Sequence, residues 1–269
     1  MPSTYAHERF GNFVYGHLPE DLQEKISEEQ DLYHIGLQGP DILFYCDPFG
    51  INGTAEAGRL MHKMSGRMFF ARETDLLERQ NGSIREAGEV YMYGMLCHYV
   101  LDSACHGYIN RYAREHGVSH GVIEGEFDRS LIAEEGRVPV NEDMTANFHP
   151  SKRSDEVISV FYPAQGLKII SRSTKRFKFF HRVLRCPGSL TGSLKRNFLY
   201  TGLKVIKQYD ALRGHITSEK PVPECVESCS HLRKILVESV PEAVRLITVF
   251  PDIPDEERFD LTFGGEREA

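Results

Sequence analysis

Apolar residues recur every three or four positions through most of this chain, which is the spacing that places side chains on one face of an α-helix. Glycine- and proline-containing breaks separate these segments, and none of them alternates as a half-buried strand does. The pattern therefore predicts an all-α protein, with helices over residues 6–17, 20–29, 54–79, 84–115, 119–134, 153–182, 190–213 and 222–247.

One polar, irregular stretch divides the chain. Residues 136–152, GRVPVNEDMTANFHPSK, combine turn-forming residues with no helical period, so they predict a connecting loop. We expect a helical core over residues 1–135 and a second helical portion over 153–250, packed on the core within one domain. Residues 251–269 are rich in acidic residues and predict a loosely attached tail.

Length and composition limit the class of protein. With 269 residues, 41% of them hydrophobic, the chain can bury a sizeable core. No stretch approaches the roughly 20 apolar residues of a membrane span, and the first residues lack the pattern of a secretory signal, so we expect a cytoplasmic protein without a transmembrane segment. Six scattered cysteines do not suggest a disulfide framework, and the Cys225/Cys229 pair lacks a second pair for structural zinc.

The net charge of −7 hides a strongly basic segment. Residues 157–209 contain no acidic residue, whereas the part from Lys168 to Lys207 carries eleven lysines and arginines. A solvated helical face that balances the acidic remainder explains this run. An anionic membrane surface or a nucleic acid bound by the 168–207 segment explains it equally. Within it we predict Lys175, Arg176 and Lys178 as substrate-binding residues.

Two short motifs carry most of the chemical information. His98, Asp102 and His106 are spaced at four-residue intervals, and so are His120 and Glu124. Four residues of helix advance about 400°, so each set projects from one helical face. Five nitrogen and oxygen ligands on two neighbouring helices indicate more than one zinc-type site, with the mixed shell typical of catalysis.

Three upstream residues extend the ligand set. His7 lies near the start of the first helix, Asp41 follows a Gly-Pro turn, and His62 lies in an amphipathic helix beside two methionines. Singly, each has an ordinary explanation as a surface, turn-forming or core residue. Together with the two motifs they provide eight ligands, about the number that a cluster of zinc ions with bridging carboxylates requires.

The ordered ligands resemble those of the zinc-dependent phospholipase C family, whose superfamily includes zinc-dependent single-strand nucleases. The matching residues are His7, Asp41 in Gly-Pro-Asp, His62, His98-x3-Asp102-x3-His106 and His120-x3-Glu124. The resemblance covers about residues 1–135 and makes them the metal-binding catalytic core. It implies an all-α, multi-helix bundle with three zinc ions in a cleft, which hydrolyses phosphodiester bonds in phospholipids or other substrates.

Carried over residue by residue, the resemblance implies three metal sites. Asp41, His62, His98 and Asp102 would hold one zinc ion, and His106, His120 and Glu124 a second. His7 and Asp102 would contribute to a third, which in secreted members is completed by the mature amino terminus. Here a prolyl amine would have to reach this site. The chain also departs from well-known secreted members in having two residues fewer between Asp102 and His106.

The resemblance leaves the mechanism and the substrate partly open. Asp41 or Glu124 would accept the proton of the attacking water, and we favour Asp41 because a turn frees a second oxygen more readily than a helix does. A nuclease would stack bases on Tyr45, Phe69, Phe70 or Tyr108, whereas a choline-specific enzyme would use an aromatic and acidic cage. A non-catalytic zinc-binding protein of the same fold is a third hypothesis.

Overall fold

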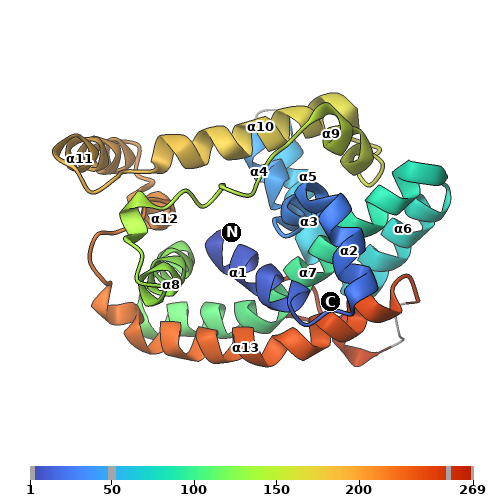
Figure 1. Cartoon of the computed structure of the whole chain (residues 1–269). Helices are drawn as coiled ribbons and strands as arrows, with labels where there is room; N and C mark the ends of the chain where they lie inside the picture. The colour runs from blue at the N-terminus through green and yellow to red at the C-terminus, as the bar shows by residue number, and fades with distance from the viewer. Residues whose placement is uncertain (1–3, 48–52, 253–255, 268–269) are drawn as a thin grey trace.

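The computed structural model describes residues 4–47, 53–252 and 256–267, and this part of the chain is helical almost throughout (Figure 1). The described residues contain two isolated β-bridges and no named strand, which confirms the all-α prediction. The helices are α1 (Thr4–Tyr15), α2 (Glu20–Glu28), α3 (Gln30–Gly36), α4 (Ile42–Cys46), α5 (Thr54–Lys63), α6 (Gly66–Glu78), α7 (Gly82–His116), α8 (His120–Glu134), α9 (Lys152–Ser159), α10 (Gly166–Leu184), α11 (Leu190–Val205), α12 (Tyr209–Leu212) and α13 (Val226–Val249). Short 3-10 turns lie at η1 (Gly39–Asp41), η2 (Pro139–Asn141), η3 (Arg213–His215), η4 (Pro223–Cys225) and η5 (Glu257–Asp260).

Several predicted helices are interrupted. The segment 54–79 forms α5 and α6, because Ser65 adopts an extended conformation and its hydroxyl caps α6 by accepting from the Met68 N–H. The segment 153–182 divides into α9 and α10 around Pro163, which cannot continue a helix. The segment 190–213 is broken after α11, where Lys207 takes a positive φ of 56°. The short helices α3 and α4 were not predicted.

Helix α7 runs through the centre of the molecule and organises the core. From Ala87 to Ser103 nearly every side chain is buried, and α1, α3, α6, α8, α9 and α13 all pack on it. Helix α3 crosses α7 at Gly36 and Gly94, where a Cβ on either glycine would lie 2.3 Å from a backbone oxygen of the other helix. This close backbone contact fixes the position of the end of α3, and with it the start of the Gly-Pro-Asp turn that follows.

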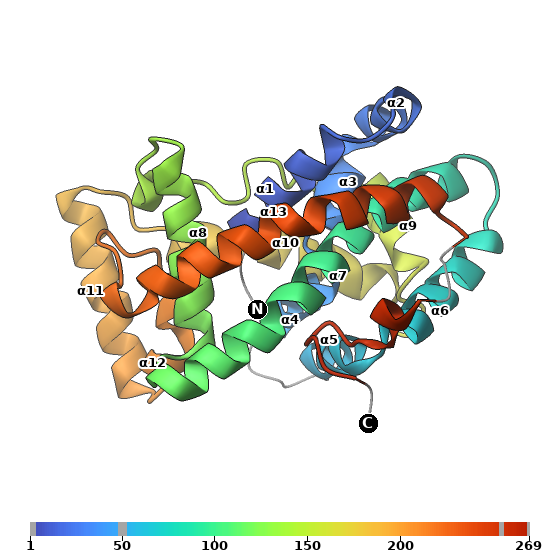
Figure 2. The ribbon, with the colours of Figure 1, turned by 90° about the horizontal axis from the view of Figure 1, so that it is seen from below.

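Two long helices lie on opposite sides of this centre. Figure 1 shows α10 along one side and α13 along the other, with α1 and α8 between them, and Figure 2 shows α13 in front when the molecule is seen from below. Helix α10 packs on α4 and α9, while α13 packs on α1, α7 and α8. The basic second half of the chain therefore covers the ligand-rich first half from both sides.

No helix in the described part of the chain has both the length and the apolar character needed to cross a membrane.

The C-terminal segment is not the loosely attached tail that its acidic composition predicts. Phe259 and Phe263 are buried, and the Tyr99 hydroxyl donates to the carbonyl oxygens of Arg258 and Leu261 at 2.8 and 2.9 Å. Arg258 in turn donates to the Val100 carbonyl. The free energy gained by burying two phenylalanine side chains exceeds the unfavourable contribution of the exposed charges. The segment therefore packs beside α5 and α6 (Figure 2).

A buried glutamate in α6 predicts a pH dependence of stability. Glu73 is almost fully buried beside Arg72, and its Oε2 has no hydrogen-bond partner among the described residues. Burial raises the pKa of Glu73 to about 7, although the Arg72 guanidinium works in the opposite direction. Because the folded pKa exceeds the unfolded one, the stabilisation is complete below about pH 4.5 and is lost as the pH rises through 7.

We therefore expect Glu73→Gln to abolish this loss. Relative to the variant, wild-type protein should lose up to roughly 3 kcal/mol of unfolding free energy between pH 4.5 and 8. Urea unfolding at a series of pH values measures this difference, and the same substitution at exposed Glu78 of α6 is the matched control. A difference that does not change with pH would contradict the prediction.

Candidate metal centre

The central ligands project from one stripe of α7. His98, Asp102 and His106 follow each other at four-residue intervals on this helix, and the first residue of α8 is His120. Gly117 ends α7 with a φ of 65°, a left-handed conformation that favours glycine, and turns the chain back so that α8 packs on α7. The two motifs therefore face each other across a short turn.

The upstream residues reach the same place from three other elements. Asp41 lies at the end of η1, which closes on α7 at Gly39: with φ of 52°, a Cβ on Gly39 would lie 2.3 Å from the His98 ring. Only glycine permits both this backbone conformation and this contact. His62 lies in the last turn of α5, and His7 in the first half of α1.

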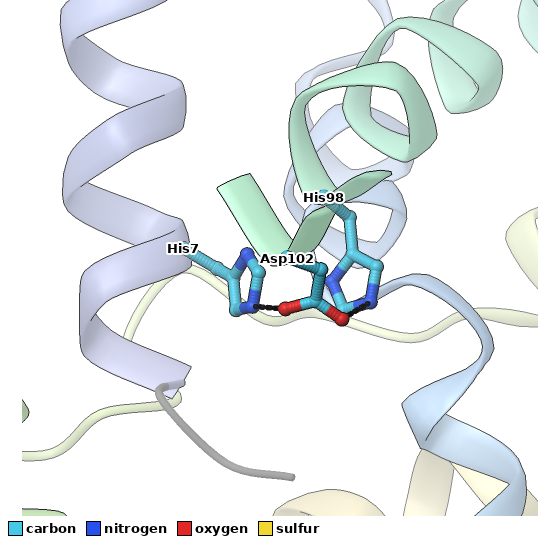
Figure 3. A group of neighbouring side chains, drawn as sticks. All are labelled: His7, His98 and Asp102. Atoms are coloured by element: carbon cyan, nitrogen blue, oxygen red, sulfur yellow. Dashed lines mark ion pairs between the residues drawn. The ribbon is translucent and has the colours of Figure 1, made fainter. Parts of the chain in front are cut away.

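Asp102 is the centre of the first cluster. Its Oδ1 lies 3.1 Å from His7 Nε2, and its Oδ2 lies 3.3 Å from His98 Nε2 (Figure 3). The same Oδ2 is 3.9 Å from His62 Nε2, which in turn lies 2.9 Å from Asp41 Oδ1. Two sets of ligand atoms lie close enough to surround an ion: His7 with His98 and Asp102, and Asp41 with His62 and His98. The amino terminus expected at the third zinc lies outside the described residues.

The second cluster lies on the other side of Asp102. Glu124 Oε1 is 3.1 Å from His106 Nε2 and 3.0 Å from His120 Nε2, so the three residues form a further set with metal-binding geometry. His106 connects the clusters, because its Nδ1 lies 3.7 Å from Asp102 Oδ2. The three-residue gap after Asp102 thus keeps His106 on the α7 stripe while turning its outer nitrogen toward α8.

Four of the histidines are oriented by hydrogen bonds on their inner nitrogen. The Nδ1–H of His62 donates to the Gly58 carbonyl at 2.8 Å, and that of His98 to the Leu37 carbonyl at 3.1 Å. The Nδ1–H of His106 donates to the Phe263 carbonyl at 2.9 Å, and that of His120 to the Asn110 side-chain oxygen at 2.8 Å. An oxygen of this kind only accepts, so each Nδ1 carries the proton. The Nε2 of a neutral ring then keeps a lone pair for a metal, as in known metal sites.

Several of these lone pairs have no hydrogen-bond donor. Among the described residues, the buried Nε2 atoms of His62, His98 and His120 and the buried Oδ1 of Asp41 have no hydrogen-bond partner. His62 Nε2 and Asp41 Oδ1 lie 2.9 Å apart but are not aligned for an N–H···O bond. Burying such acceptors against each other is costly unless a cation lies between them, so the residues fit a metal ion.

The electrostatics of the clusters also favour a cation. Burial alone would raise the pKa of Asp102, yet His106 and His98 hold this pKa well below its usual range, so the carboxylate is ionised. Burial opposes ionisation of Glu124 as well, yet the pKa of this carboxyl lies well below its usual range, and the neighbouring His106 and His120 contribute to this lowering. Burial lowers the pKa of His106, but Asp102 and Glu124 raise it to about 9. The site therefore favours positive charge between its two carboxylates.

A cleft of about 750 Å³ opens onto both clusters. Its lining residues in the described part of the chain are Asp41, Phe44, Arg59, His62, Lys63, Asp102, His106, Asn110, His120, Thr262, Gly264, Glu266 and Arg267. Five of the eight ligands therefore line the cleft, and the other three, His7, His98 and Glu124, lie behind them in the protein. The cleft gives a small polar group access to the five ligands that line it.

The structure does not bring every predicted site residue to this cleft. Lys175, Arg176 and Lys178 lie on α10 and are not among its lining residues. Arg176 donates to the Cys46 carbonyl and Lys178 to the Phe148 carbonyl, whereas Lys175 is exposed. Their predicted role in substrate binding has no support in this geometry.

The aromatic residues considered for base stacking are also placed elsewhere. Tyr45, Phe69 and Phe70 are buried in the core, where Phe69 and Phe70 pack edge to face. Tyr108 stacks on His231 of α13. In the described part of the cleft the lining includes Phe44 and none of these four residues. Tyr45, Phe69, Phe70 and Tyr108 therefore do not provide a surface on which bases could stack in the cleft.

Two contributors to the site escaped the sequence analysis. Phe263 lies against the His62 and His98 rings, with centroid distances of 5.3 and 5.9 Å, and its carbonyl orients His106. Asn110 orients His120. The two phenylalanines of the tail, Phe259 and Phe263, were the signal for a buried anchor there. Asn110 had none, because a single asparagine in a helix is common.

Comparison with known protein families agrees with this geometry. The family model described as "Zinc dependent phospholipase C" matches residues 6–165, more than half of the chain and all but the C-terminal contributions to the clusters. This match confirms the resemblance read from the ordered ligands. No curated protein and no solved structure shows significant similarity to this chain.

Proposed function

Because the chain belongs to the zinc-dependent phospholipase C family, we propose that it is a hydrolase that cleaves phosphodiester bonds of phospholipid-type substrates. The observation that carries the proposal is the convergence of His, Asp and Glu side chains from five elements on one cleft, with buried lone pairs that lack donors. Zinc bound there would supply Lewis acidity for the phosphoryl oxygens and lower the pKa of a water molecule.

We place at least two zinc ions in the clusters. Asp41, His62 and His98 form one shell with Asp102, whose Oδ2 lies within 3.9 Å of both histidine Nε2 atoms. His106, His120 and Glu124 supply the second shell. His7 Nε2 and Asp102 Oδ1 offer a pair of atoms for a third ion.

The surrounding residues orient the ligands and provide a general base for the reaction. The Nδ1 hydrogen bonds hold the rings of His62, His98, His106 and His120 with Nε2 directed at the clusters, so little reorganisation is needed when charge develops on the phosphoryl group. Asp41 lines the cleft, whereas Glu124 is more deeply placed and has its Oε1 engaged by two histidines. This difference supports Asp41 as the general base that takes the proton of the attacking water. Water enters the cleft beside His120, the most exposed ligand.

The rim of the cleft supports an anionic substrate. Arg59, Lys63 and Arg267 contribute positive charge, and Glu266 is the one carboxylate in the described lining that does not belong to the clusters. Arg59 is paired with Glu56, while Lys63 is exposed at the end of α5. Such a rim attracts a phosphate or an anionic headgroup, and in the described lining Phe44 is a single ring, fewer than the aromatic cage of a choline site requires.

Metal analysis and substrate assays test the proposal. We expect at least two zinc ions per purified chain, and hydrolysis of a phospholipid or a soluble phosphodiester that stops on chelation and returns with zinc. Single-stranded DNA in a parallel assay tests the nuclease alternative. Fewer than two zinc ions per chain would contradict the clustered site.

Two variants distinguish hydrolysis by this site from hydrolysis by a contaminating enzyme. His98→Ala removes a buried ligand shared by two of the candidate ligand sets, and Glu124→Ala removes the carboxylate of the other. Each should lower hydrolysis by roughly 10²-fold or more, since loss of a few kcal/mol of transition-state stabilisation has this effect. Full zinc content without hydrolysis of any of the three substrates would favour a non-catalytic zinc-binding protein.

A further inference from the structure

Helix α11 exposes an apolar stripe. Leu190, Leu194, Phe198 and Val205 are 79, 61, 78 and 76% exposed, and Ile206 directly after the helix is 56% exposed. At about 100° per residue the four side chains of the helix fall within a sector of about 80°. Single exposed apolar residues are ordinary, but an aligned row of four on one helix marks an interaction surface.

The opposite side of α11 faces the protein and is of mixed character. Arg196 is buried, donates to the Cys186 carbonyl and pairs with Glu219 at 3.0 Å. Gly192 packs on the backbone of Pro187, since a Cβ there would lie 1.8 Å from the Pro187 oxygen. Helix α11 is therefore attached through Gly192, Arg196 and the partly buried Leu199 and Leu203, while a second apolar row points away from the protein.

The charge around this stripe defines the partner. Helix α11 contains Lys195, Arg196 and Lys204 and no acidic residue, and exposed Lys207 follows it. The acid-free stretch extends over residues 157–209, so α11 itself and the segments directly around it add no negative charge; Glu219, which lies beside the helix, is paired with Arg196. A basic helix with a row of leucine, valine and phenylalanine matches the interface of an anionic phospholipid layer, where lysines contact headgroups and apolar side chains enter the acyl boundary.

A nucleic acid fits this surface less well. Bases stack on aromatic rings, and Phe198 is the aromatic member of a stripe that is otherwise aliphatic. We propose that the exposed face of α11 (Leu190, Leu194, Phe198 and Val205, with Lys204 and Lys207) docks the protein on anionic phospholipid membranes.

The docking face is connected to the metal clusters through packed elements. Helix α11 contacts α12, and α12 and η3 pack on α8, whose first two turns carry His120 and Glu124. The contact of η3 with α8 is close, because a Cβ on Gly125 would lie 2.1 Å from the Gly214 oxygen. Docking through α11 would hold the cleft near a lipid surface. This consequence rests on the proposed function, whereas the docking itself does not.

Co-sedimentation of the full-length, zinc-loaded protein with vesicles tests the inference. The probe is phosphatidylcholine vesicles with or without phosphatidylglycerol. We expect binding to the anionic vesicles that weakens with salt, and a loss of about tenfold or more in Leu194→Ser/Phe198→Ser. Val237→Ser, at a 54% exposed position of α13, is the matched control and should bind like wild type. Equal binding by the double variant and wild type overturns the proposal.

Hydrolysis of a soluble phosphodiester distinguishes failure of docking from failure of the proposed function. The double variant should cleave it at the wild-type rate and retain the wild-type melting temperature, because its changes are on the surface. Hydrolysis without vesicle binding by wild type rejects docking alone, whereas binding without hydrolysis supports docking and rejects the enzyme. Binding of single-stranded DNA in place of vesicles, or self-association that the double variant abolishes in place of vesicle binding, also overturns the docking proposal.

Discussion

Replacing Asp102 with alanine is expected to lower phosphodiester hydrolysis by about 10³-fold and to reduce the zinc content of the purified protein. Asp102 is the carboxylate shared by the clusters: its oxygens lie within 3.9 Å of nitrogen atoms of His7, His62, His98 and His106. Without it, the four imidazoles lose the one carboxylate that they share, and the remaining carboxylates lie at the two ends, Asp41 beside His62 and Glu124 beside His106. Loss of one ligand elsewhere leaves more of the cluster intact.

Zinc content by atomic absorption and hydrolysis of a soluble phosphodiester measure this effect. Asp102→Asn keeps the side-chain volume but removes the charge, and should also lose zinc. Ser103→Ala, the next residue of α7, changes a buried side chain that bonds the Val100 carbonyl, and is the matched control. Full zinc content in Asp102→Ala would remove Asp102 from the site.

Truncating Phe263 is expected to damage both the fold and the metal site. The ring is fully buried and packs on His62, Phe69, His98 and Tyr99, at centroid distances of 5.3, 5.1, 5.9 and 5.1 Å. Phe263→Ala should cost about 3–5 kcal/mol of unfolding free energy and lower the melting temperature by roughly 10 °C. The His106 ring should also lose some of its orientation, because the Phe263 carbonyl accepts its Nδ1–H.

Thermal unfolding with and without a chelator separates these effects. We expect Phe263→Ala to retain zinc more weakly than wild type, so that the chelator acts at lower concentration. Phe198→Ala makes the same chemical change at an exposed position and should leave melting almost unchanged. A melting temperature of Phe263→Ala equal to that of wild type would mean that the C-terminal segment does not hold the core.

Local periodicity was sufficient to find the ligands of α7 and α8. The i, i+4 spacing of His98, Asp102 and His106 requires only helical geometry to place them on one stripe, and all three lie on α7. The all-α class followed from the same periodicity. His7, Asp41 and His62 show no such pattern, and only their order along the chain, as a family resemblance, connected them with the site.

Element boundaries failed where tertiary contacts competed with helix propensity. The segment 54–79 is periodic throughout, yet it breaks at Ser65. A continuous helix would not allow Gly66 to lie against the Tyr99 ring, where a Cβ would come within 2.5 Å of the hydroxyl. The break lets α5 end at His62 inside the cleft while α6 packs on α7. Propensity is a weak preference that such contacts override.

The sequence by itself determined the fold class, the family and the residues with metal-binding chemistry, because these depend on residue type, order and helical period. Tertiary structure decided which atoms of these residues are directed toward a metal ion. The carbonyl oxygens of Leu37, Gly58 and Phe263, from three distant segments, orient the histidines whose Nε2 atoms meet the carboxylates. It also decided that Phe259 and Phe263 attach the acidic tail to the core and that α11 exposes a row of apolar side chains. Main-chain groups carry no residue-specific signal in a sequence, so only packing could show where they point.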